Sequence, residues 1–559
     1  MARLPNILLI VADCARADKW LGPGRRTVTP NLDRLAAAGV SFNTVIAEKA
    51  CTTPCFASLL TGLYSPRHGV HLVWGYRLPE RVPLLTEVLA RRGYHAYAEV
   101  SGPLLPEMGL ARGFEHYEYR APCDLLHSAW GDRLIERLRS GHYRRPWFIL
   151  LHLWELHPHR HVEPACDTER FGADTYERAV SSLDRQLARL FAAVDDDTLI
   201  AFTGDHGEKT QFETYRPGTA VDYARRLLGI DESAAAADSR LHGLATYGVV
   251  RWAGPSVLNQ LYGINAPLMR NVRLRDAPAG QAAETHAPRR SRNVATWRDR
   301  LRLLWLTPQV FLHDLLALGR PLRLTRMLER RGLLDASRAR RKVERLARFI
   351  GRQELLDMHM RIWANSYRNN LHEGHMLHVY DFLVRVPLVL HWPDRLPAGL
   401  ACERMVRQPD ILPTVLDLIG IDPVECGEID GRSFGWLAHT DRPMTGAAGN
   451  WPTGGLPSAF LSLSGLPPDL ELRGVRTQEY KYTFGPHNDE LPQELYDLRA
   501  DPGEATNLAP ARRDLCAELR ALADGFVRDR SLQAADVIEL TPDDRRQVEG
   551  HLRRLGYLE

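Results

Sequence analysis

The chain has 559 residues, of which 44% are hydrophobic and 25% are charged, and its formal net charge is +3. This composition is typical of a globular protein and excludes a disordered or membrane-spanning class. The length favours two domains, or one large domain with an insertion.

The first 210 residues alternate apolar strands with helices. In helix 29–40, Thr29 is a capping residue, Pro30 occupies the first turn and Gly39 ends the helix. The alternation predicts a doubly wound α/β domain with a mostly parallel sheet and helices on both faces. The predicted elements are strand 6–13, helix 29–40, strand 41–49, helix 54–62, a helix and strand within 83–100, and strands 146–157 and 197–208.

Polar residues follow several of these strands. Ligands bind at the carboxyl ends of the strands in such sheets, where Asp13, Asp205 and His206 stand. Two carboxylates and an imidazole suit Zn²⁺ or Mn²⁺, and we expect one ion. His157 is interpreted as a group that protonates a leaving oxygen. A second zinc site formed by His157 and the two nearby histidines, His159 and His161, is the less favoured alternative.

A basic helical insertion is predicted at 212–370, where strand signals are few. Residues 289–352 contain 18 Arg or Lys against five Asp or Glu. The segment is either a solvated basic face, a lid over an anionic substrate, or a patch that meets an anionic membrane surface. No nucleic acid partner is expected, because no aromatic platform or reader motif accompanies the charge.

The α/β pattern resumes with a strand at 386–391 and a helix at 407–421, so we assign 1–440 to one α/β domain that contains the insertion. A Gly- and Pro-rich stretch follows and is typical of a long loop. Residues 441–559 are predicted to form a small α+β subdomain, with a strand pair in 471–484 and a helix at 511–529.

A cytoplasmic location is expected from three observations. The eight cysteines are mostly scattered and form no CxxC pair, which favours a reducing compartment. The N-terminal apolar run is short and lacks a small-residue cleavage site, so it is interpreted as a strand rather than a signal peptide. No stretch approaches the ~18 apolar residues of a membrane span.

The stretch CTTPCFASLLTG at 51–62 predicts a helix start that carries a nucleophile. A hydroxyl at a helix N-terminus lies at the positive end of the helix dipole, where an oxyanion also binds well. A bound metal would lower the pKa of that hydroxyl. Residue types alone leave cysteine and threonine open as the attacking group.

Several motifs in order along the chain resemble the sulfatase family of the alkaline-phosphatase superfamily. The resemblance spans nearly the whole chain apart from the insertion. The motifs are NILLIVADCARAD, TPNLDRLAAAGVSF, TTPCFASLLTGLYSPRHGV, TGDHGE, YDFLVRVPLVL, PDILPTVLDLIGI, DGRSF, VRTQEYKY and ELYDLRADPGEATNL.

The resemblance implies that Thr52 is the nucleophile. The family pattern C-x-P-x-R-x-x-L-L-T-G, whose first residue becomes formylglycine, places Pro54 on its proline and Thr52 on the nucleophile. Threonine cannot form formylglycine, and Phe56 replaces the arginine that the modification needs. Cys14 stands where the family has a second aspartate. These departures indicate a threonine branch, whose superfamily relatives act on phosphorus.

The resemblance further implies a divalent metal (Mn, Zn or Ca) bound by four residues, which are Asp13, Thr52, Asp205 and His206. His157 matches the family's active-site histidine and His375 a second, substrate-binding histidine, with His372 as the rival of His375. The catalytic residues implied are Thr52, His157 and His375, and His157 or His375 protonates the leaving oxygen. Cys14 is an uncertain ligand. The implied protein is a sulfatase-like hydrolase, or a transferase, of phosphate, phosphonate or sulfate esters, of the phosphodiesterase or phosphoryl type. It acts on a small anionic ester through a covalent intermediate. The alternatives are a sulfuric ester hydrolase and a catalytically silent binding protein.

Overall fold

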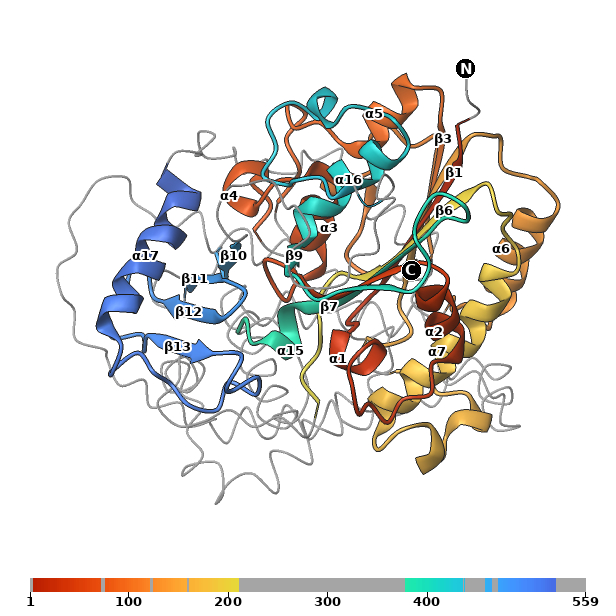
Figure 1. The fold of residues 1–559 in the computed structure, drawn as a ribbon. Helices are drawn as coiled ribbons and strands as arrows, with labels where there is room; N and C mark the ends of the chain where they lie inside the picture. The colour runs from red at the N-terminus through yellow and green to blue at the C-terminus, as the bar shows by residue number, and fades with distance from the viewer. Residues whose placement is uncertain are drawn as a thin grey trace, which may run out of the picture. The chain divides into compact units, whose positions relative to one another are not determined.

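The computed structural model describes residues 4–71, 76–120, 124–157, 160–210, 378–435, 437, 458–464 and 471–528. They belong to one compact unit that combines Met1–Ala224 with His372–Glu539 (Figure 1). The predicted insertion 212–370, its basic segment 289–352, and the two histidines 372 and 375 lie outside the described residues. The proposed boundary at 440 also falls outside them and stays a prediction.

A mixed, mostly parallel sheet is the centre of the fold. Among the described residues it has nine strands in the order β4-β3-β5-β1-β6-β7-β2-β8, and β9 pairs with β2. Only β7 runs antiparallel to its neighbours, β6 and β2. The predicted α/β fold class is therefore confirmed. The strands are β1 (Asn6–Ala12), β2 (Val40–Ile46), β3 (His95–Val100), β4 (His116–Tyr119), β5 (Trp147–Leu153), β6 (Thr198–Gly204), β7 (Arg385–His391), β8 (Leu400–Cys402) and β9 (Val406–Arg407).

Helices cover both faces of this sheet (Figure 1). On one side lie α2 (Pro30–Ala37), α6 (Ala129–Arg139) and α7 (Thr175–Phe191), and on the other lie α3 (Thr52–Thr61), α5 (Leu85–Arg91) and α16 (Ile411–Leu418). Short helices complete the unit: α1 (Ala17–Trp20), α4 (Ser65–His68), α15 (Asp381–Val384), and the 3₁₀ turns η1 (Pro106–Met108), η2 (Pro164–Cys166), η3 (Glu169–Phe171), η4 (Gln408–Asp410) and η5 (Pro423–Cys426).

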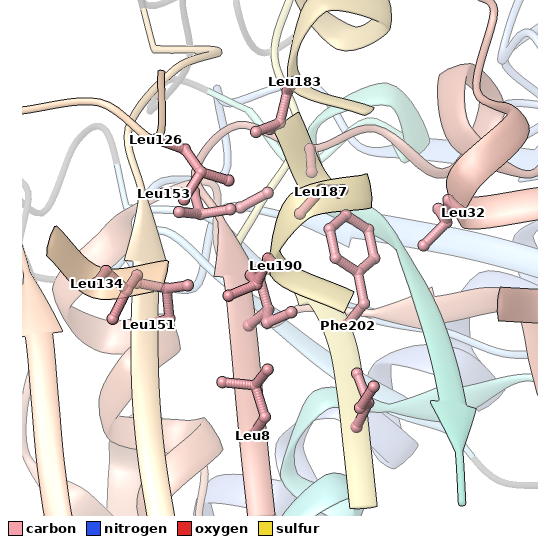
Figure 2. Packing of buried hydrophobic residues seen from close by; sticks show 14 of the residues in the cluster. Leu8, Leu32, Leu126, Leu134, Leu151, Leu153, Leu183, Leu187, Leu190 and Phe202 are labelled. Atoms are coloured by element: carbon pink, nitrogen blue, oxygen red, sulfur yellow. The ribbon is translucent and has the colours of Figure 1, made fainter. Parts of the chain in front are cut away.

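The main core lies between the sheet and α7. Strand side chains such as Leu8, Leu151 and Phe202 face Leu187 and Leu190 of the helix (Figure 2). All five are fully buried or nearly so. This packing holds β5, β1 and β6 as a rigid base, which matters because their carboxyl ends carry the site described below.

The predicted helix at 54–62 begins two residues earlier, at Thr52. Pro54 therefore lies in the first turn of α3, where a helix needs no N–H donor from it. Cys51 is the extended N-cap residue, and Gly62 ends the helix in the left-handed conformation with φ 69°. The helix start thus places Thr52 at the N-terminal end of α3.

A second, antiparallel sheet forms the C-terminal part, as predicted. Its strands are β10 (Ala459–Ser462), β11 (Arg473–Arg476), β12 (Tyr480–Phe484) and β13 (Glu494–Asp497), in that order. The helix α17 (Arg513–Arg528) packs on it through Leu519 and Ala523. Leu461 of β10 joins Ile46 and Ala50 in a shared apolar cluster, which fastens this sheet beside β2. None of the described helices is long and apolar enough to cross a lipid bilayer.

Candidate active site

Three adjacent strand ends bring the candidate residues together. The strands β5, β1 and β6 are parallel, and Val11 of β1 lies opposite His152 and Thr203. Asp13 directly follows β1, and Asp205 directly follows β6. Asp13, His152 and Asp205 are all fully buried. The edge of the sheet that the sequence predicts as a ligand site therefore carries two carboxylates and an imidazole.

Thr52 reaches this cluster from the first turn of α3. Its hydroxyl donates to Oδ2 of Asp13 at 3.3 Å, and its Oγ1 is also 3.3 Å from Nε2 of His206. Oδ2 of Asp205 lies 3.5 Å from the same Nε2 atom. The structure thus places the four predicted metal ligands in one buried cluster.

The Asp205–His206 turn is held in a defined orientation. Oδ1 of Asp205 accepts backbone N–H groups of Cys14, at 3.1 Å, and of His206, at 2.7 Å. Nδ1 of His206 lies 2.8 Å from the carbonyl oxygen of Gly207. Because a carbonyl only accepts, Nδ1 carries a proton, and in the neutral ring Nε2 turns its lone pair to Thr52. That is the orientation of a histidine ready to bind a metal.

The donor set fits a divalent cation. Oδ1 of Asp13 and Oδ2 of Asp205 are buried and have no hydrogen-bond partner among the described residues. Buried carboxylate oxygens are costly unless they are paired or bind a metal. Ligand atoms of Asp13, His152 and Asp205 lie within 4.8 Å of one another, as do those of Asp13, Cys14 and His206. Oxygen and imidazole donors in this arrangement suit Zn²⁺ or Mn²⁺.

The pKa values of the two carboxylates are also consistent with a divalent cation at this site. Burial raises the pKa of Asp205, and the negative charge of Asp13 raises it further. Burial alone would also raise the pKa of Asp13, but its hydrogen bond with His152 and the charges of His157 and His206 bring that pKa below its usual range. Without a cation, the site therefore favours one ionised and one less acidic carboxyl group.

His152 was missed by the sequence analysis, which assigned no role to it. Nε2 of this residue is 3.2 Å from Oδ2 of Asp13. The ring of Phe56 packs edge-on against it, with centroids 4.9 Å apart. The sequence did offer one indication of its role, since His152 is a polar residue inside the apolar run that forms β5. Phe56, which replaces the arginine of the family pattern, is thus a wall of the site.

His157 lies near the cluster but outside both groups of potential ligands. It is half-buried and stacks on Trp154, with centroids 3.9 Å apart. His161 instead stacks on His127 at 3.6 Å. Among the described residues, every group of three or more potential ligands includes Asp13, so they offer no support for a second zinc site at His157 and His161. His159, His372 and His375 are not described.

Cys14 adopts an unusual backbone conformation next to Asp13. Its φ is 58°, in the left-handed region that non-glycine residues rarely occupy. This conformation aims its N–H at Asp205, and its thiol donates to Oε2 of Glu208 at 3.5 Å. Burial, with the nearby charges of Asp13 and Glu208, raises the pKa of the thiol well above its ordinary value.

Gly207→Ala is expected to destabilise the protein by about 1–3 kcal/mol through overpacking. A Cβ at this position would lie 2.1 Å from the carbonyl oxygen of Phe382, and the Gly207 N–H bonds to Leu383 at 2.7 Å. Urea unfolding measures the change. Gly525→Ala is the matched control, because its Cβ meets nothing within 4 Å and a helical alanine adds ~0.5–1 kcal/mol. Equal stabilities of the two variants would contradict the close packing of the Gly207 turn.

Two family models match the chain. Residues 5–226 match the model described as Sulfatase, and residues 375–522 match N-sulphoglucosamine sulphohydrolase, C-terminal. The first match contains Asp13, Thr52, Asp205 and His206. The second contains the antiparallel sheet and most of α17.

Curated relatives and solved structures agree with these models. An N-acetylglucosamine-6-O-sulfatase of Bacteroides thetaiotaomicron is 21% identical over 533 residues, which are 90% of this chain and 82% of that protein. Human arylsulfatase A is 28% identical over 271 residues, 38% of this chain and 53% of that protein. The phosphonate monoester hydrolase of Agrobacterium radiobacter shares the fold, with a TM-score of 0.54, 18% identity and coverage of 96% and 98%.

A further structure, solved in complex with its substrate D-glucosamine-2-N,6-O-disulfate, also has a TM-score of 0.54. It is 14% identical and covers 95% of this chain and 100% of that one. At such identities these structures show a common fold. The two family models, which together match residues 5–226 and 375–522, and the curated relatives lead to one conclusion: the chain belongs to the sulfatase family.

Proposed function

We propose that this protein is a metal-dependent hydrolase of phosphate or phosphonate esters in which Thr52 is the nucleophile. The observation that carries the proposal is the position of Thr52 Oγ1, in contact with Asp13 and His206 at the N-terminus of α3. The substrate is a small anionic ester.

In the first step of the proposed reaction, residues of the chain supply the nucleophile, stabilise charge and donate a proton. Thr52 gives up its hydroxyl proton to solvent, and Oγ1 attacks the phosphorus in line while the leaving oxygen departs on the opposite side. The positive end of the α3 dipole stabilises the charge on the transferring group. His157 donates a proton to the leaving oxygen.

Water then attacks the phosphothreonine and frees Thr52, whereas an acceptor alcohol in place of water would make the enzyme a transferase. Asp13, Thr52, Asp205 and His206 would hold the divalent cation. When bound, the cation supplies Lewis-acid stabilisation of negative charge and lowers the pKa of the Thr52 hydroxyl.

Threonine chemistry favours phosphorus over sulfur. A threonine cannot be converted to the formylglycine aldehyde, because its Cβ carries a methyl group. A simple sulfate ester on Thr52 would be hard to resolve. The fold shared with a phosphonate monoester hydrolase is compatible with this substrate class. A sulfuric ester hydrolase is the second candidate, because the curated relatives are sulfatases and one structural neighbour is bound to a sulfated sugar.

A panel of aryl esters tests the substrate class. We expect the Mn²⁺- or Zn²⁺-loaded protein to hydrolyse bis-p-nitrophenyl phosphate or p-nitrophenyl phenylphosphonate with a kcat/KM at least about tenfold above that for p-nitrophenyl sulfate, a difference of ~1.4 kcal/mol in transition-state stabilisation. p-Nitrophenyl phosphate completes the panel. A preference for the sulfate would favour the sulfatase alternative. No turnover of any ester, together with no bound metal, would indicate a silent binding protein.

A further inference from the structure

His152 is a fully buried polar side chain that the proposed reaction does not use. Nε2 approaches Oδ2 of Asp13 at 3.2 Å, while Nδ1 is buried and has no hydrogen-bond partner among the described residues. Buried polar atoms in native proteins are nearly always paired. The nitrogen that faces the cluster is Nε2, and beside it one oxygen of Asp13 and one of Asp205 also lack partners among the described residues.

The side chains at the ends of three neighbouring strands lie close enough together to bind one metal ion. Ligand atoms of Asp13, His152 and Asp205 lie within 4.8 Å of one another, and they come from three neighbouring strands of one sheet. Each strand is fixed by hydrogen bonds to the next, so the ligand positions are set before a cation binds. His206, with Nε2 facing the same cluster, supplies a second imidazole.

Two aromatic rings and an arginine hold His152 in place. Phe56 packs edge-on against it at 71°, and Trp154 does so at 84° with centroids 5.6 Å apart. The guanidinium of Arg120 donates to the backbone carbonyl of His152. Phe56 thus packs an apolar ring, rather than the arginine of the family pattern, against the imidazole.

We propose that His152 is a direct ligand of the divalent cation, together with Asp13, Asp205 and His206. A centre with two imidazoles prefers Zn²⁺ or Mn²⁺ to Ca²⁺, which takes oxygen ligands almost exclusively. The inference rests on the metal dependence proposed above but not on the choice of Thr52 or on the substrate. It adds a ligand that the motif-based assignment does not contain.

X-ray absorption at the metal edge tests the ligand directly in the wild-type protein. The Zn²⁺-loaded full chain is expected to show the scattering of two imidazoles and no sulfur. His152→Gln is expected to show one imidazole. In titrations with Zn²⁺, the affinity of His152→Gln for the ion is expected to fall below that of the wild type. The expected fall exceeds the ~10–100-fold loss that follows when a residue that only supports a ligand is removed. Ca²⁺ is expected to bind the wild type far more weakly than Zn²⁺.

His161→Gln is the matched control, because His161 stacks on His127 and lies outside both ligand groups, so the Zn²⁺ affinity of this variant is expected to stay at the wild-type value. One imidazole in the wild-type spectrum, a sulfur scatterer from Cys14, or an unchanged affinity in His152→Gln would overturn the role of His152 and leave the proposed function intact. A wild-type protein that binds no metal would overturn both. The wild-type spectrum decides the matter even if His152→Gln does not fold.

Discussion

Thr52→Ala is expected to lose ester hydrolysis almost completely, with kcat falling by roughly 10³–10⁶-fold, the range seen when a nucleophile is deleted. The physical reason is that the hydroxyl in contact with Asp13 and His206 is the attacking group. Stopped assays on the ester that the wild type prefers measure the loss. Mass spectrometry of quenched wild-type turnover is expected to find the phosphoryl group on the peptide that contains Thr52.

Thr52→Ser is the matched control for this experiment. It keeps a hydroxyl at the first position of α3 and removes only a methyl group, so it is expected to retain a substantial part of the activity. Circular dichroism and urea unfolding check that both variants fold. Activity in Thr52→Ala comparable to that of the wild type, or a phosphoryl group on another residue, would refute the assignment of the nucleophile.

Removal of the cation is expected to abolish activity and to lower the thermal stability of the protein. Asp13 and Asp205 are both fully buried, and without a cation one oxygen of each carboxylate has no hydrogen-bond partner among the described residues. A cation present at 100 times its Kd adds about 2.7 kcal/mol to the free energy of unfolding. Thermal unfolding with a chelator, and again after Mn²⁺ or Zn²⁺ is restored, measures the effect.

Two variants separate this effect from general destabilisation. Asp205→Asn is expected to lose the response of Tm to metal, because it removes a ligand charge from the cluster. Asp174→Asn is expected to keep that response. Asp174 caps α7 by accepting the N–H of Glu177 at 2.7 Å, and asparagine caps a helix equally well. A Tm and an activity that a chelator leaves unchanged would contradict metal dependence.

Local signals along the chain predicted much of the fold correctly. The apolar run at 6–13 became β1, and the run at 197–208 contains β6, because a strand buried on both faces reads as continuous hydrophobicity. Proline and glycine marked α3 to within two residues of its start. The antiparallel direction of β7 was not predictable in this way, since the direction of a strand depends on its connections and not on its residues.

The residues of the candidate site were likewise predictable from the sequence only in part. Asp13, Asp205 and His206 were predictable because they end apolar strands, and parallel strands end at one edge of a sheet. Thr52 followed from its place at a helix start and from the family pattern. Their roles as ligands and nucleophile stay predictions until the experiments above are done.

Only the tertiary structure showed where His152 lies. A single histidine inside an apolar strand carries no periodic signal, and its meaning depends on the register that sets it beside Asp13. The contact between Phe56 and this histidine joins residues 96 positions apart in the chain, which no local pattern encodes. The sequence by itself determined the family, the fold class and most of the cluster, whereas the packing of β5, β1 and α3 decided which further side chains face it.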